Sequence, residues 1–448
     1  MQSPRTLAAV AGLLAGGFVS GADAAPAPKA PPNVLLIISD DQAWTDYGFM
    51  GHSHIRTPHL DRLASESLLF PRGYVPTSLC CPSLASIITG LYPQQTRVTG
   101  NEPPLPKGMN RGPAGSDPDY RSEVARMTHF LDGFPTLPTE LARRGYVSFQ
   151  SGKWWMGHPS RGGFTDGMTH GDPERGGRHG DEGLKIGREG LQPIFNFIEG
   201  AGGKPFFVWY APFLPHQPHT PPERLLEKYR GVTPSLHVAK YWAMCEWFDE
   251  TCGELLQYLE AQGLAENTLV LYVADNGWIQ HPDAARYRED SKRSQYDAGL
   301  RTPILVRWPG HITPRTVDVP VSSIDLAPTI LTACDLKPTP AMSGVNLLDE
   351  AAVRARKAIF GACFLHNAVD LDVPQRNLTY RWCIEDRWKL IRPDPVNVTT
   401  ANKRGLAPDS VELYDLIADP HEERNLAGNE RGRVEAMTGL LNRWWPGR

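Results

Sequence analysis

The sequence predicts an α/β fold: a large domain with a mostly parallel central sheet flanked by helices, followed by a small C-terminal subdomain with an antiparallel sheet. Three observations predict it. Short apolar runs that suit fully buried strands recur through the first two thirds of the chain. Amphipathic segments alternate with these runs, which is typical of a parallel sheet. Beyond about residue 343 the pattern changes to short strand-like segments with polar connections.

The predicted strands of the large sheet are short and rich in β-branched or aromatic residues. Asn33–Ser39 (NVLLIIS), Phe206–Ala211 (FFVWYA) and Thr268–Ala274 (TLVLYVA) are apolar at nearly every position. Such runs are typical of strands that helices cover on both faces. The segment 304–308 is a weaker candidate for a further strand.

Three helices are predicted from their ends and their periodicity. One begins at Pro58, with Thr57 as the N-cap and proline in the first helical position. A second spans 136–145 and ends at a glycine. The third spans 237–263, where apolar residues recur at helical spacing.

Two long stretches, 99–119 and 157–183, are rich in glycine, proline and charge and predict functional loops. The overall organisation then divides into three parts. We expect a signal peptide over 1–24, a large domain over 33–343 and a C-terminal subdomain over 344–448.

The N-terminal segment has the three parts of a secretory signal peptide. Arg5 is followed by an apolar stretch over 7–19 and by Ala22-Asp23-Ala24, a small-x-small cleavage site. No later stretch reaches the roughly 18 apolar residues of a membrane-spanning helix. We therefore expect a secreted or periplasmic protein with no membrane span in the mature chain.

Charge and cysteine content exclude two further classes of protein. Lys+Arg 46 against Asp+Glu 50 gives a net charge of −4, so a strongly basic nucleic-acid-binding protein is excluded. Seven cysteines in an exported chain leave at least one unpaired, and at this length they do not form a disulfide framework.

Oxygen-bearing side chains follow two of the predicted strands. Asp40 and Asp41 end one strand, and Asp275 and Asn276 end another. Ligands of open α/β sheets lie outside the carboxyl ends of the strands. Either pair alone also suits a cap or a turn, but together they predict a hard cation, Ca²⁺ or Mg²⁺.

The segment 80–90 (CCPSLASIITG) predicts a helix with Pro82 in its first turn. Cys80 then lies at the helix N-terminus, where backbone N–H groups favour an anion. A thiol at this position could be a nucleophile. A buried structural pair of Cys80 and Cys81 is the alternative.

This segment resembles the Cys-x-Pro-Ser-Arg signature of the formylglycine-dependent (type I) sulfatases of the alkaline phosphatase superfamily. Seven further blocks resemble that family in the same order along the chain. They are PNVLLIISDDQAWTDYGFMG, TPHLDRLASESLLF, GKWWMG, APFLPHQPHTPPE, NTLVLYVADNG, SKRSQYDAGLRTPILVRWPG and ELYDLIADPHEERNLA.

The resemblance implies a role for each matching residue. Cys80, which alone has proline at +2, would be converted to formylglycine (3-oxoalanine) by a maturation enzyme. Lys153 and Lys292 would bind the sulfate, and His216 would protonate the leaving alcohol, with His219 as its competitor. The implied Ca²⁺ ligands are Asp40, Asp41, Asp275 and Asn276.

Two positions depart from the family pattern. Leu84 stands where the family has arginine, and Trp155 stands where it has a histidine that accepts a proton. A tryptophan N–H can only donate. We expect another basic residue to substitute, with His158, Arg178 and Arg111 as candidates in that order. A decayed, inactive enzyme is the alternative.

The function that the resemblance implies is hydrolysis of a sulfate ester, on a sulfated small molecule or, as we expect, a saccharide. Two alternatives remain open. One is a phosphodiesterase or phosphonate hydrolase on the same fold. The other is an inactive sulfatase-like binding protein.

Overall fold

A computed structural model describes residues 1, 30–110, 114–175, 177–400, 402 and 404–447. Apart from Met1, the predicted signal peptide lies outside the described residues. Contacts hold Pro31–Arg448 together as one unit. The boundary between 343 and 344 therefore stays a prediction.

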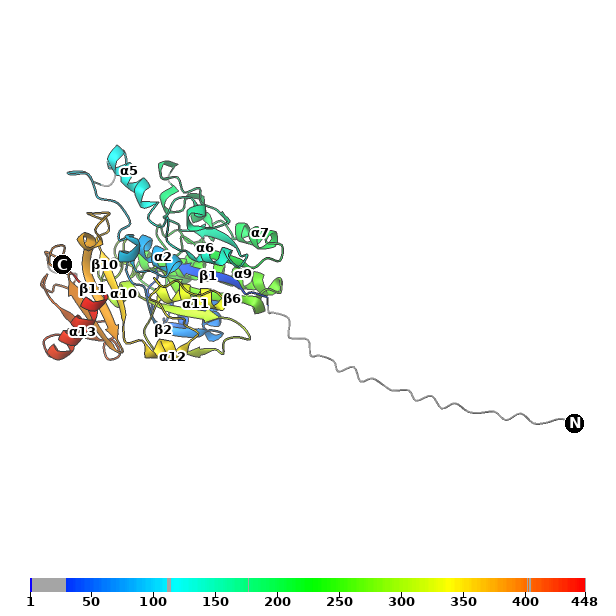
Figure 1. The fold of residues 1–448 in the computed structure, drawn as a ribbon. Coiled ribbons are helices and arrows are strands. Elements are labelled where there is room, and N and C mark those ends of the chain that lie inside the picture. The colour runs from blue at the N-terminus through cyan, green and yellow to red at the C-terminus, as the bar shows by residue number, and fades with distance from the viewer. Residues whose placement is uncertain (2–29, 111–113, 176, 401, 403, 448) are drawn as a thin grey trace. The chain divides into compact units, whose positions relative to one another are not determined.

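The predicted α/β fold is confirmed. The large sheet has the strand order β4-β3-β5-β1-β6-β7-β2-β8, and β9 also pairs with β2. Figure 1 labels β1, β2 and β6 of this sheet. Strand pairs are parallel except for β6 with β7 and β2 with β7. Its strands are β1 (Asn33–Ser39), β2 (Leu68–Tyr74), β3 (Val147–Gly152), β4 (Asp166–Gly167), β5 (Phe206–Ala211), β6 (Thr268–Ala274), β7 (Arg301–Arg307), β8 (Arg315–Thr316) and β9 (Val321–Ser322).

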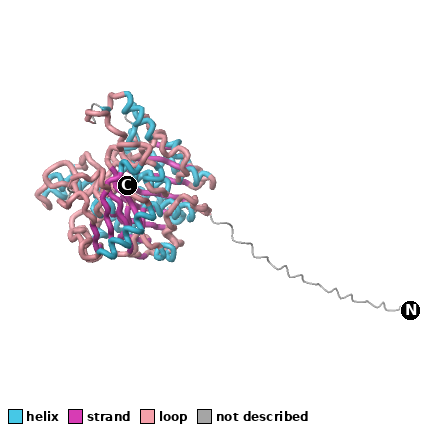
Figure 2. Tube along the Cα trace, turned by 60° about the vertical axis from the view of Figure 1, so that its left-hand side comes forward, coloured by secondary structure: helices cyan, strands magenta, loops and turns pink. Residues whose placement is uncertain are grey.

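Helices contribute to the apolar cores on both faces of this sheet. Figure 2 distinguishes helices, strands and loops by colour along the chain. The α-helices are α1 (Pro58–Ser65), α2 (Cys80–Thr89), α3 (Pro93–Thr96), α5 (Pro118–Met127), α6 (Leu137–Ala142), α7 (Gln192–Gly200), α8 (Glu223–Arg230), α9 (Leu236–Ala261), α10 (Asp297–Leu300), α11 (Leu326–Ala333), α12 (Glu350–Ala355) and α13 (Arg431–Trp444). The short 3₁₀ helices are η1 (Gly48–Met50), η2 (Pro159–Gly162), η3 (Pro173–Arg175), η4 (Gly177–His179), η5 (Asp181–Lys185), η6 (Ala265–Asn267), η7 (Ser323–Asp325) and η8 (Pro374–Asn377).

Apolar cores lie on both faces of the sheet, as the strand sequences predict. Val34, Leu36 and Ile38 of β1 belong to the core that includes α2, α6 and α11. The intervening Leu35 and Ile37 belong to the opposite core, with α1, α7 and α9. Successive side chains of a strand point to opposite faces, so a strand without a polar face requires both cores.

The start of α1 agrees with the sequence, but its cap does not come from Thr57. The N-cap residue makes no side-chain bond to the helix backbone. Instead, the carboxylate of Asp249 in α9 accepts bonds from the backbone N–H groups of His59 (3.2 Å) and Leu60 (2.7 Å). A distant residue therefore satisfies N–H groups that every helix leaves free at its first turn.

The predicted small antiparallel sheet is present as β10 (Ile359–Phe364), β11 (Leu378–Glu385), β12 (Trp388–Pro393) and β13 (Glu412–Asp415), in that order. Met437 and Leu441 of α13 pack on one of its faces, against Leu390 and Leu413. From the other side the buried Lys389 of β12 contacts Asp297 in α10 (2.8 Å).

Neither a membrane helix nor a disulfide appears in the described chain. Its helices are all too short or too polar to cross a bilayer. The seven cysteines are free and buried.

Candidate active site

The polar residues that follow β1 and β6 meet at one edge of the sheet. These two strands are parallel neighbours, with Ser39 opposite Ala274 at their ends. The N–H of Asp275 donates to the carbonyl of Ser39 (2.8 Å), which holds both chain exits together. The side chains placed at this edge are Asp40, Asp41, Asp275 and Asn276.

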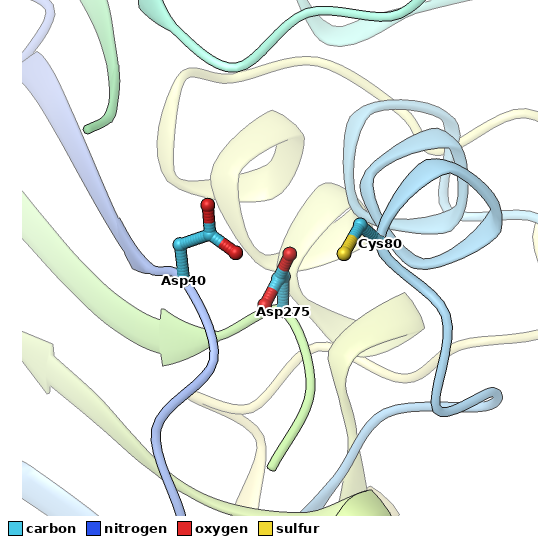
Figure 3. Close-up of side chains that lie close together, drawn as sticks. All are labelled: Asp40, Cys80 and Asp275. Carbon is cyan, nitrogen blue, oxygen red and sulfur yellow. The ribbon is translucent and has the colours of Figure 1, made fainter. Parts of the chain in front are cut away.

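Cys80 joins this group from the first residue of α2. Its thiol donates to the amide oxygen of Asn276 (3.3 Å). Figure 3 shows the side chains of Asp40, Asp275 and Cys80 converging, each from a different element. One ligand atom from each of these three residues lies within 4.8 Å of the others. Burial raises the pKa of the Cys80 thiol to about 12.

Asp41 is the most connected carboxylate of the cluster. Its backbone has a φ of 65°, a left-handed conformation that costs a non-glycine residue about 1 kcal/mol. Its Oδ1 accepts from Nδ2 of Asn276 (2.6 Å) and pairs with Nζ of Lys292 (2.5 Å). Nε2 of His216 lies 3.2 Å from its other oxygen. Burial alone would raise the pKa of Asp41, but Lys292 and His216 hold it at about 2.

The two predicted sulfate-binding lysines both enter the cluster. Lys153, just after β3, places Nζ 2.8 Å from Oδ1 of Asp40. Lys292 reaches Asp41 from the segment before α10. Both ammonium groups are buried with their carboxylates, so each charge is compensated inside the protein.

The donor set fits a divalent cation. Three carboxylates face two lysines, and the buried Oδ2 atoms of Asp40 and Asp275 have no hydrogen-bond partner in the part of the chain that the structure describes. Burial raises the pKa of Asp40 well above its usual range, more than Lys153 lowers it. A cation among these oxygens would satisfy them and favour the ionised carboxylates. Oxygen ligands of this kind suit Ca²⁺ or Mg²⁺ rather than zinc.

Only one of the two competing histidines contacts the cluster. His216 lies beside Asp41, as described above. The ring of His219 packs against Tyr241 (5.4 Å between centroids) and Trp278 (5.8 Å). The geometry therefore favours His216 over His219 for a role at the reacting group.

The two positions that depart from the family pattern both hold buried apolar side chains. Leu84 is buried in the core beneath α2. Trp155 belongs to the same core, and its indole N–H has no hydrogen-bond partner among the described residues. Neither side chain supplies a charge or a proton acceptor to the cluster.

Two basic residues from the predicted loop 157–183 pack on Trp155. The guanidinium of Arg178 lies 5.1 Å from the indole ring, and Arg178 is only 7% exposed. The ring of His179 lies 4.1 Å from the same indole. Arg178 was a predicted candidate, whereas His179 was not, because nothing in the sequence distinguishes it from other histidines of the loop.

The first-ranked substitute, His158, lies in a different environment. It is exposed, and its Nδ1 accepts from the backbone N–H of Ser160 (3.3 Å) at the start of η2. No contact between His158 and the cluster is present, so proximity to Trp155 in sequence was a poor guide. Arg111, the third candidate, lies outside the described residues.

Comparisons with known sequence families agree with this geometry. The family model described as Sulfatase matches residues 32–336. A second model, described as N-sulphoglucosamine sulphohydrolase, C-terminal, matches residues 287–442. Together the two models cover the large sheet, the small sheet and most of α13.

Individual relatives are similar over most of the chain. The N-acetylgalactosamine-6-sulfatase of Homo sapiens is 31% identical over 374 residues, which are 73% of this chain and 67% of that protein. Arylsulfatase A of Homo sapiens is 29% identical over 92% of this chain and 86% of its own. The crystal structure of Ps i-CgsB has the same fold, with a TM-score of 0.70 at 22% identity, over 93% of this chain and 94% of that one. The chain thus spans about two thirds of the length of the first relative.

Proposed function

This chain belongs to the sulfatase family of the alkaline phosphatase superfamily, and from that premise we propose that it hydrolyses the sulfate ester of a carbohydrate, using a formylglycine formed from Cys80 and a bound Ca²⁺. As a member of the family it is a sulfuric ester hydrolase. The observation that carries the proposal is that Asp40, Asp275 and Asn276 lie beside Cys80, in a cluster that Asp41 and the two lysines join through contacts with these residues and with one another. The saccharide is proposed because the matched relative is named for N-acetylgalactosamine 6-sulfate.

The residues that would hold the metal are Asp40, Asp41, Asp275 and Asn276. Bound there, Ca²⁺ would supply Lewis-acid stabilisation of negatively charged oxygens. We prefer Ca²⁺ to Mg²⁺ because three carboxylates and an amide form a site made almost entirely of protein oxygens.

Lys153 and Lys292 would neutralise the sulfate group and the charge that develops as its S–O bond to the sugar breaks. They lie on opposite carboxylates, Asp40 and Asp41, so they would hold the sulfate from two sides of the cluster. His216 would donate a proton to the departing alcohol. The negative charge of a bound sulfate ester would favour the protonated imidazole that this step requires.

Arg178 is our candidate for the cation that Leu84 does not supply. Arg178 is buried beside Cys81. Its charge lowers the pKa of the Cys81 thiol, although burial raises that pKa by more. Its Nε and Nη1 atoms have no hydrogen-bond partner within the described ranges of the chain. The proposed route to the mature protein includes export and modification by a formylglycine-generating enzyme.

The test is peptide mass spectrometry combined with parallel assays on protein from a host with the maturation system. The tryptic peptide 73–97 should carry one aldehyde at Cys80 and an intact thiol at Cys81. 4-Nitrophenyl sulfate should be hydrolysed with a kcat/KM about a hundredfold above that for 4-nitrophenyl phosphate or a phosphonate monoester.

Two outcomes would contradict this proposal. Active enzyme with two intact thiols would remove the formylglycine mechanism. Preferential turnover of the phosphorus esters would support the phosphodiesterase or phosphonate hydrolase reading. Cys80→Ser and Cys81→Ser form the matched pair, since only the first should abolish turnover.

A further inference from the structure

The loop 212–222, between β5 and α8, contains His216, the proposed acid. Nδ1 of this ring lies 2.5 Å from the carbonyl oxygen of Gln217. Because a carbonyl can only accept, Nδ1 carries a proton. The other nitrogen, Nε2, lies 3.2 Å from Oδ2 of Asp41. The direction of Nε2, which would protonate the leaving alcohol, therefore depends on where the backbone of this loop lies.

Arg188, from the segment between η5 and α7, binds the loop at three points. Its Nε and Nη2 donate to the carbonyl of Phe213 (2.9 and 2.7 Å), and Nη2 also donates to the carbonyl of His216 (2.9 Å). Its Nη1 donates to the hydroxyl of Thr220 (3.2 Å). Hydrogen bonds from a charged donor are stronger than neutral ones, and a planar guanidinium fixes several directions at once. The loop is thus held before, at and after His216.

The ring of Phe213 lies between this contact and the charged cluster. It stacks on the imidazole of His216, with 4.2 Å between centroids and 27° between planes. The guanidinium of Arg188 and Nζ of Lys153 each lie 5.4 Å from its centroid. Cations are attracted to the face of an aromatic ring. One ring therefore lies beside the proposed acid, a proposed sulfate-binding lysine and Arg188.

A short turn over residues 187–190 places Arg188 beside the loop. The N–H of Gly187 donates to the carbonyl of Gly190 (3.0 Å). Both glycines have left-handed backbones, with φ of 77° and 100°, which glycine adopts without strain. A Cβ atom at Gly187 would lie 2.7 Å from the hydroxyl of Tyr210 in β5. Glycine therefore lets the turn lie close to the strand from which the loop departs.

We propose that Arg188 is the positioning residue for His216. It holds the loop 212–222 so that Nε2 of His216 points at the leaving oxygen of the bound sulfate ester. The inference rests on the proposed function, in which His216 is the acid, and deepens it. Without the guanidinium, the carbonyls of Phe213 and His216 lose a charged donor. The loop then occupies a wider range of positions, and the leaving alcohol is protonated more slowly.

Two aryl sulfates distinguish a positioning role from a merely structural one. 4-Nitrophenolate is a weak base that leaves with little protonation, whereas phenolate is a stronger base that depends more on an acid. His216→Ala should therefore lower kcat/KM for phenyl sulfate about a hundredfold more than kcat/KM for 4-nitrophenyl sulfate. Arg188→Met should change the same ratio in the same direction, by about tenfold.

Three further variants complete this comparison. Arg188→Lys keeps the charge but binds fewer acceptors at once, so it should change the ratio less than Arg188→Met does. Arg224→Met is the matched control, since Arg224 pairs with Glu250 on the surface of α8, the helix after the loop. It should leave the ratio unchanged. The double variant Arg188→Met/His216→Ala should have the ratio of His216→Ala, because Arg188 acts through His216.

Hydrogen exchange followed by mass spectrometry tests the loop without turnover. Segment 212–222 should exchange about tenfold faster in Arg188→Met than in the wild type. Helix α13 should keep the wild-type rate, and so should segment 212–222 in Arg224→Met.

Equal losses on both esters in Arg188→Met, together with a selective loss in His216→Ala, would overturn the inference. Unchanged exchange of segment 212–222 would overturn it as well. If Arg188→Met does not fold, Arg188→Lys decides by the same two measurements.

Failure of the proposed function has a different signature. Equal losses on both esters in His216→Ala would contradict the acid role of His216, and absence of wild-type turnover on both esters would contradict sulfate ester hydrolysis. In either case the exchange rate of segment 212–222 still decides whether Arg188 holds the loop.

Discussion

Asp40 and Asp41 are adjacent in sequence but face different partners. Asp40 pairs with Lys153, whereas Asp41 pairs with Lys292, Asn276 and His216. The backbone of Asp41 is left-handed, and its side chain contacts other partners than the side chain of Asp40 does. Two neighbouring carboxylates could then hold the proposed cation from separate directions, and Lys153 and Lys292 compensate part of the negative charge that is buried with them.

We expect Asp40→Asn to abolish the stabilisation that Ca²⁺ gives the wild type. A metal that binds only the folded state stabilises it by about 2.7 kcal/mol at a hundred times its Kd. Thermal unfolding with CaCl₂ and with EDTA measures this effect, and turnover should fall in parallel. Asp166→Asn is the control, since Asp166 is exposed on β4. An unchanged response to Ca²⁺ in Asp40→Asn would place the metal elsewhere.

At the scale of elements, contacts between helices distant in sequence support β1, the strand that precedes the proposed metal ligands Asp40 and Asp41. Asp249 of α9 is fully buried and caps the first turn of α1. These two helices cover the same face of the sheet as Leu35 and Ile37 of β1. The cap therefore holds α1 against α9 on the face of the sheet to which Leu35 and Ile37 of β1 point.

Asp249→Ala should lower the free energy of unfolding by about 1–2 kcal/mol, because two backbone N–H groups lose their acceptor. Urea unfolding measures the change. Glu250→Ala is the matched control. Glu250 pairs with Arg224 on the surface, so its loss should cost less than about 1 kcal/mol. Equal effects of the two substitutions would contradict a specific cap.

At the scale of the whole molecule, a buried charge cluster joins the small sheet to the segment that carries Lys292. Lys389 of β12 pairs with Asp297 of α10 (2.8 Å) and with Glu422 (2.7 Å). The N–H of Asp297 also donates to Glu422 (2.7 Å). The two carboxylates share one lysine. Burial raises the pKa of Glu422 more than Lys389 lowers it, so that this pKa is about 7.

This cluster should make stability depend on pH. The folded state binds a proton on Glu422 more tightly than the unfolded state, whose carboxyl titrates near 4.5. The resulting stabilisation is complete below about pH 4.5 and is lost as pH rises through 7, a change of at most about 3 kcal/mol. Between pH 5 and 8 the free energy of unfolding of the wild type should therefore fall relative to that of Glu422→Gln.

Urea unfolding at several pH values measures this difference. The exposed neighbour supplies the control: Glu423→Gln should keep the pH dependence of the wild type. Identical slopes for Glu422→Gln and the wild type would show that Glu422 does not titrate in this range.

The sequence alone determined the α/β class, the strands β1, β5 and β6, and the residues that meet at the ends of β1 and β6. Strands without a polar face require cores on both sides, and parallel neighbours such as β1 and β6 bring their carboxyl ends to one edge. The sequence therefore predicted that Asp40 and Asp275 lie close together. The motif around Cys80 indicated the third residue of the cluster.

Only the tertiary structure decided what surrounds Trp155 and what caps α1. His158 is nearest to Trp155 in sequence yet is exposed at η2, while Arg178 and His179 pack on the indole from farther along the loop. Asp249 of α9 likewise contacts α1, although the two are far apart in sequence. An irregular loop has no periodicity that fixes where its side chains point, so packing against the rest of the fold decides which of them reach the site.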